Sequence, residues 1–98
     1  MNYQQLKAKQ KEFNLDHYQD MVNNGSIWSS QGSTGRFFMD LLNTGVLILP
    51  KKATYDYYGN RIPSRDDLKQ GTKGTFQNAV NFWSNMDADT EQWLTEIS

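Results

Sequence analysis

The stretch Gly45-Val46-Leu47-Ile48-Leu49-Pro50 decides the fold class. Four apolar residues, two of them β-branched, stand between a glycine and a proline. A short apolar run of this composition favours a buried strand over a continued helix. Its expected partner is Thr54 to Tyr58, with Tyr55 and Tyr57 on one face, and together they would form a small β-hairpin. Because most of the remaining chain has helical periodicity, we expect a helix-dominated α+β fold.

Helical patterns flank this expected hairpin on both sides. An apolar stripe predicts a long N-terminal helix over residues 2–23, which Asn14 divides if its side chain competes for backbone hydrogen bonds. A capping-box pattern at Ser64 predicts a short helix that ends at Gln70. The other expected helices are a short central one over residues 35–43 and a C-terminal helical hairpin built from residues 75–86 and 87–97.

Composition limits the class of protein. The 98 residues carry a formal net charge of −1, and they fit a single domain over residues 1–98. Near-neutral charge argues against bulk attraction to nucleic acid or to anionic membranes. There is no cysteine, no apolar run near the roughly 20 residues that span a bilayer, and no signal-peptide pattern. We therefore expect a soluble, cytoplasmic protein.

The inventory of reactive side chains argues against catalysis. The single histidine, His17, falls within a helical stripe, and neither a nucleophile elbow nor a Walker A loop is present. Glu12, Asp16 and Asp20 lie on one helical face, but helical geometry spreads them over roughly 12 Å, too far apart to converge on a cation. We expect no enzyme activity, no cofactor and no metal site.

Two glycine-rich loops combine hydroxyls, backbone N–H groups and a positive charge. They are Gly32-Ser33-Thr34-Gly35-Arg36 and Gly71-Thr72-Lys73-Gly74-Thr75, and each precedes an expected helix. Such loops can bind anions, and they also serve as ordinary turns and helix caps. The second loop resembles the Gly-x-x-Gly loop with which KH domains clamp a nucleic-acid backbone. Both interpretations stay open, with Arg36 and Lys73 as candidate binding residues.

Residues 55–65 hold the densest collection of tyrosines and arginines in the chain. These are the side chains most enriched at protein-binding hot spots, and they also stack on nucleic-acid bases. The candidate binding surface consists of Tyr57, Tyr58, Arg61, Arg65 and Lys73. In the alternative interpretation, the rings close a small core and the arginines pair with Asp56, Asp66 or Asp67.

A resemblance covers residues 24–75. The motifs that carry it are Gly25-Ser26-Ile27-Trp28, the two glycine loops, Asp56-Tyr57-Tyr58-Gly59-Asn60-Arg61 and the following Ile62-Pro63-Ser64-Arg65. In this series the chain resembles short uncharacterised proteins encoded by marine cyanophages. The resemblance implies a viral accessory role in the cytoplasm of an infected cell, and it brings no active site with it.

The functional expectation is a small non-enzymatic accessory protein that binds a protein partner through the tyrosine and arginine segment. One alternative is nucleic-acid backbone binding through residues 71–74. The other is a structural or self-assembling virion component, since a small aromatic-rich chain can complete its core against copies of itself as a homo-oligomer.

Overall fold

This computed structural model describes residues 1–29 and 33–97. These residues contain five α-helices, one 3-10 helix and one antiparallel β-hairpin. In chain order they are α1 (Tyr3–Glu12), α2 (Asp16–Asn23), η1 (Ser26–Ser29), α3 (Ser33–Thr44), β1 (Thr54–Tyr55), β2 (Arg61–Ile62), α4 (Phe76–Ser84) and α5 (Ala88–Ile97). The prediction of a helix-dominated α+β fold with a small hairpin is confirmed.

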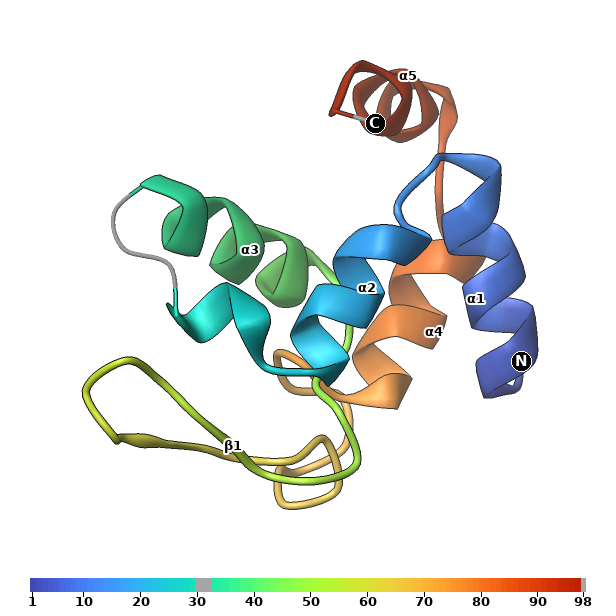
Figure 1. Cartoon of the computed structure of the whole chain (residues 1–98). Helices are drawn as coiled ribbons and strands as arrows, with labels where there is room; N and C mark the ends of the chain where they lie inside the picture. Colours follow the sequence, from blue (N-terminus) through green and yellow to red (C-terminus); the bar gives the residue numbers. More distant parts are fainter. Residues whose placement is uncertain (30–32, 98) are drawn as a thin grey trace.

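The helices gather around one hydrophobic core, and the hairpin projects from one end of it (Figure 1). Helix α1 packs against α2 and α4, while α3 packs against α4 and η1. Figure 1 shows α5 at the end opposite the hairpin, nearly end-on where α4 is seen from the side, so α5 does not run alongside α4. Leu94 still buries α5 against the core. No helix within residues 1–29 and 33–97 is both long and apolar enough to cross a bilayer.

The N-terminal helical pattern is divided at Asn14, as the sequence allowed. Asn14 adopts a left-handed conformation with φ of 58°, which interrupts the helix between Glu12 and Asp16. Asparagine tolerates this conformation better than most residues do. The break folds α2 back onto α1, and Leu15 at the turn becomes fully buried.

The strand prediction for Val46 to Leu49 is wrong. This segment is buried, at 0–6% exposure, but within the described chain no strand pairs with it. Its backbone is satisfied by other groups: the Leu47 N–H donates to the carbonyl of Leu41 at 3.2 Å, and the Leu49 N–H donates to that of Gly74 at 2.8 Å. The residues are apolar because they are core, and burial alone produced the strand-like pattern.

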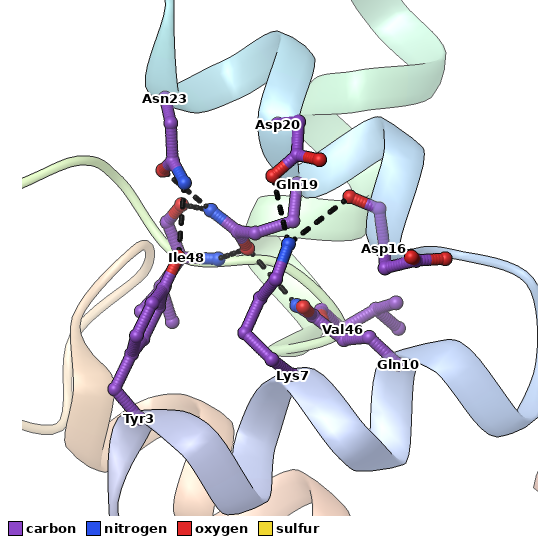
Figure 2. A network of polar contacts seen from close by, with 9 residues as sticks. All are labelled: Tyr3, Lys7, Gln10, Asp16, Gln19, Asp20, Asn23, Val46 and Ile48. Atoms are coloured by element: carbon purple, nitrogen blue, oxygen red, sulfur yellow. Dashed lines mark hydrogen bonds and ion pairs between the residues drawn. The ribbon is translucent and has the colours of Figure 1, made fainter.

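Two buried glutamines take the place of a neighbouring strand (Figure 2). Gln19 of α2 accepts the Ile48 N–H at 3.0 Å and donates to the Ile48 carbonyl at 2.9 Å. Gln10 of α1 donates to the Val46 carbonyl at 3.0 Å and to Gln19 at 2.9 Å. Asn23 extends the network from Gln19 to the Tyr3 hydroxyl. Buried backbone groups must find partners, and side chains of the first two helices supply them here.

The hairpin pairs different segments from those expected. Thr54 lies opposite Ile62 and Tyr55 opposite Arg61, so β1 turns back onto β2 rather than onto residues 46–49. Within residues 46–49, the backbone groups of Ile48 are hydrogen-bonded to the Gln19 side chain and are not free to pair with a strand. Strand β1 pairs with the chain that follows it instead.

The predicted helix from Ser64 to Gln70 is also wrong, because the structure has turns there. Half of the capping box forms, with the Asp67 carboxylate accepting the Ser64 N–H at 3.1 Å. The Arg65 N–H, however, donates to the carbonyl of Pro50 at 3.0 Å, which ties this segment to the preceding chain. A segment this short gains little from helix formation, since nucleation is costly.

The two helices predicted over residues 75–86 and 87–97 are confirmed as α4 and α5, but the predicted helical hairpin is wrong, because α5 does not pack along α4. Thr75 caps α4, accepting the N–H of Asn78 at 3.3 Å, and Asp87 accepts the N–H of Thr90 at 2.8 Å at the start of α5. Gly45, which ends α3, is required by packing as well as by its φ of 104°. A Cβ there would lie 2.8 Å from both the Asn78 carbonyl oxygen and the Phe82 Cβ. The close approach of α3 to α4 therefore depends on this glycine.

Candidate functional site

Three tyrosines on the projecting hairpin are the most exposed large hydrophobic residues of the described chain. Tyr55, Tyr57 and Tyr58 are 63%, 64% and 76% exposed. The Tyr57 and Tyr58 rings meet edge to face with their centroids 5.3 Å apart. Isolated apolar side chains on a surface are common, but three exposed tyrosines within four residues of a protruding element are typical of a binding surface. We call these three residues the tyrosine tip.

Asp56 orders the backbone of the turn that carries Tyr57 and Tyr58. Its carboxylate accepts the backbone N–H groups of Tyr58 at 2.9 Å and Asn60 at 2.8 Å, and also the Asn60 side-chain amide at 3.1 Å. These hydrogen bonds, the Asn60 N–H first among them, lower the pKa of Asp56 below its ordinary value. The Tyr57 N–H donates to the Trp28 carbonyl at 2.9 Å and attaches the hairpin to η1. The rings are therefore presented on an ordered turn.

Arg61 lies at the base of the tip and is paired. Its guanidinium donates to the Asp67 carboxylate at 2.8 Å, and this hydrogen bond is the main reason why the pKa of Asp67 is lowered. Both side chains are about half exposed, so the pair contributes little to stability. The ion pair fixes the orientation of the Arg61 side chain, which stays about half exposed next to Tyr55 on the neighbouring strand. The alternative prediction of an arginine paired to a nearby aspartate holds for this residue.

Arg65 does not belong to the exposed surface on which the sequence placed it. The side chain is only 8% exposed, and its Nη1 donates to the Leu49 carbonyl at 3.2 Å. The guanidinium carbon lies 4.9 Å from the centre of the Tyr3 ring, in cation–π contact. The grouping of Arg65 with Tyr57 and Tyr58 is thus corrected, since Arg65 faces α1 and the chain that leads into the hairpin.

Lys73 is exposed, but the loop around it turns its backbone donors inward. The Gly74 N–H donates to the Leu42 carbonyl at 3.3 Å, and the Gly71 N–H to the Thr75 hydroxyl at 3.1 Å. The Thr72 N–H donates to the carbonyl of Lys69. These groups are used for folding, which leaves little of the loop to clamp a phosphate. Lys73 itself borders an apolar groove of about 240 Å³ between α3 and the base of the hairpin.

The remaining sequence candidates lie apart from the tip. Arg36 is exposed in the first turns of α3, and the loop residues before it lie outside the described side chains. His17 is exposed on α2, and its ring contacts that of Tyr18 at a tilt of 44°. Of the acidic stripe, Asp20 pairs with Lys7 at 2.7 Å. Among the described residues no group of three potential metal-ligating side chains converges.

Charge divides the chain unevenly. Six of the ten basic side chains, but only three of the eleven acidic ones, lie between Lys51 and Lys73. We call residues 51–73, which include the tyrosine tip, the basic segment. It carries a net charge of +3 and the rest of the chain −4.

Three residues of the basic segment were not among the binding residues expected from the sequence, namely Lys51, Lys52 and Tyr55. The local excess of positive charge is the sequence signal that points to the two lysines. Both lysines are exposed, and within the described residues neither forms an ion pair. Comparisons of this chain with protein-family models, with curated proteins and with solved structures found no match.

Proposed function

We propose that this chain is a small non-enzymatic accessory protein that binds an acidic surface of a protein partner through its tyrosine tip. The observation that carries the proposal is the exposure of three tyrosines within four residues of one hairpin, two of them in ring contact on a turn that Asp56 already orders. Tyrosine supplies a large contact area at low entropic cost, and a surface ordered before binding avoids part of the cost of association.

Charge supports an acidic partner. The tip is part of the basic segment, whose net charge is +3, and complementary potentials between two partners speed their encounter and fix their orientation. A long polyanion such as a nucleic acid fits less well, because the remainder of the chain is acidic and repels it. The N–H groups of Gly71, Thr72 and Gly74 already donate within the fold, which weakens the case for backbone clamping by that loop.

We also propose where this protein acts, namely in the cytoplasm of a phage-infected cell. The resemblance of residues 24–75 to cyanophage proteins supports an accessory role in the cytoplasm of an infected cell. A structural or self-assembling role is the competing possibility, with a second copy of the chain as the partner. The experiment below therefore has to separate a foreign protein, a nucleic acid and a second copy.

Site-specific photo-crosslinking in the native host tests the proposal. A photoreactive phenylalanine analogue replaces Tyr57 in one variant and Gln92, an exposed residue of α5, in the matched control. Crosslinked species are purified with and without nuclease and identified by mass spectrometry. We expect a nuclease-resistant adduct with one acidic protein from position 57 and none from position 92.

Three results would contradict the proposal. Equal adducts from both positions would indicate unspecific contact, and an adduct removed by nuclease would indicate nucleic acid. An adduct with a second copy of this chain would favour self-assembly. Tyr58→Ser should also weaken formation of the adduct at position 57, because it removes the neighbouring ring, which is exposed and not part of the core.

A further inference from the structure

Arg65 is a buried cation without a carboxylate partner. Its side chain is only 8% exposed, and among the described residues no ion pair includes it. One of its nitrogens donates to the Leu49 carbonyl and the guanidinium rests against the Tyr3 ring, while its other N–H groups have no protein acceptor in the described chain. Because Arg65 lines open surface hollows and its remaining N–H groups have no protein acceptor among the described residues, these donors are free to bind an anion there.

Two surface hollows open at Arg65. The first has a volume of about 440 Å³ and is lined by Tyr3, Asn23, Pro50, Lys51, Lys52 and Arg65. The second, of about 410 Å³, shares Tyr3, Lys51 and Arg65 with the first and adds Phe76 and Asp66. The fold itself gathers these cations, because the Arg65 N–H donates to the Pro50 carbonyl and so holds the turn that carries both lysines beside it.

We propose that these hollows form a binding site for the phosphate group of a small phosphomonoester. Arg65 offers a planar fork of donors that fits phosphate oxygens, and Lys51 and Lys52 add two mobile point charges, which together suit a dianion. The Tyr3 and Phe76 side chains provide apolar walls for the organic part of such a ligand. None of the three tyrosines of the tip lines these hollows, so the proposed phosphate site is separate from the proposed protein-binding surface.

The direct test measures thermal stability and NMR spectra of the intact chain while inorganic phosphate replaces chloride at constant ionic strength. A ligand that binds only the folded state raises the melting temperature according to its concentration and affinity. We expect a saturable rise with phosphate that chloride does not give, together with a shift of the Arg65 side-chain N–H resonance. Constant ionic strength removes the general effect of screening.

Matched double variants locate the site. Lys51→Gln with Lys52→Gln should weaken phosphate binding at least about tenfold, the factor equivalent to one charge-assisted contact. Lys69→Gln with Lys73→Gln removes the same charge from exposed positions of the basic segment that line neither hollow, and it should leave binding within about twofold. Asp66→Asn should tighten binding, because it removes the carboxylate at the edge of the second hollow.

The source of the phosphate is distinguished by comparing inorganic phosphate with a nucleoside 5′-monophosphate. Tighter binding of the nucleotide assigns an organic phosphomonoester, and equal binding assigns the free anion to the same site. Absence of a saturable effect of either probe beyond chloride would overturn the proposal. Equal weakening in both double lysine variants would overturn it too. Arg65→Gln, checked for folding by circular dichroism, should abolish the phosphate-dependent rise in melting temperature.

Discussion

Replacement of Gln19 by methionine should cost a large part of the stability of this protein. Gln19 is fully buried and satisfies both backbone groups of Ile48, the N–H at 3.0 Å and the carbonyl at 2.9 Å. Methionine has a similar length and can form neither hydrogen bond. Each buried backbone group left without a partner costs about 1–3 kcal/mol, so we expect a loss of about 2–6 kcal/mol. A domain of this size has a total stability of about 5–15 kcal/mol.

The assay is urea unfolding at equilibrium, followed by tryptophan fluorescence and circular dichroism. In a thermal melt, at about 4–8 °C per kcal/mol, the melting temperature should fall by at least about 8 °C. Gln4→Met, at an exposed position of α1, is the matched control and should change little, since the two residues have similar helix propensity. Gln10→Met should cost less than Gln19→Met, because Gln10 satisfies only the carbonyl of Val46 among backbone groups and its own Oε1 has no partner.

The result that would refute this reasoning is a loss of less than about 1 kcal/mol for Gln19→Met, the net value of one ordinary hydrogen bond. A loss no larger than that of Gln10→Met would refute it as well. Either outcome would mean that the Val46 to Leu49 segment does not depend on the glutamines for its backbone partners.

Three further predictions concern the backbone and pH. Asn14→Ala should destabilise the fold by about 1 kcal/mol and Asn14→Gly should not, because φ is positive there; urea unfolding of both variants measures this. Gly74→Ala should be more destabilising than Gly71→Ala in the same assay. Both residues have positive φ, but only at Gly74 would the new Cβ lie 2.8 Å from Leu49. The pKa values of Asp56 and Asp67 are lowered from 3.8 in the folded state, so their contribution is present above that pH and is lost as the pH falls through the folded values. Asp56→Asn with Asp67→Asn should flatten the acid limb of the stability curve, and an unchanged limb would contradict this.

Apart from the helix predicted at Ser64, the sequence indicated the α-helices well, because apolar periodicity and capping chemistry are local signals. Apolar periodicity located α3, α4 and the divided α1 and α2, and Thr75 and Asp87 begin their helices as their side-chain chemistry suggests. The segment after Gly45 was misread for a physical reason. The backbone partners of Val46 and Ile48 are Gln10 and Gln19, which are distant in sequence and belong to a residue type that is usually exposed.

Only part of the candidate site could be predicted from the sequence. The density of tyrosine and arginine between residues 55 and 65 was visible, and the exposure of Tyr57 and Tyr58 agrees with a binding surface. Nothing local to Arg65 shows that its N–H bonds to Pro50 and that its guanidinium packs against Tyr3 from the first helix. Burial of one arginine and exposure of its neighbour Arg61 depend on tertiary contacts that no short motif encodes.

The measurement that bears most directly on the proposed role is the affinity of the purified crosslinked partner for the intact chain, compared with a Tyr57→Ser and Tyr58→Ser double variant of equal stability. If the tyrosine tip is the binding surface, the double variant should bind at least about 30-fold more weakly, corresponding to a hot spot of about 2 kcal/mol. Gln92→Ser on α5 should bind like the unaltered chain. An affinity of the double variant within about twofold of the unaltered chain, well below the hot-spot range, would contradict the account.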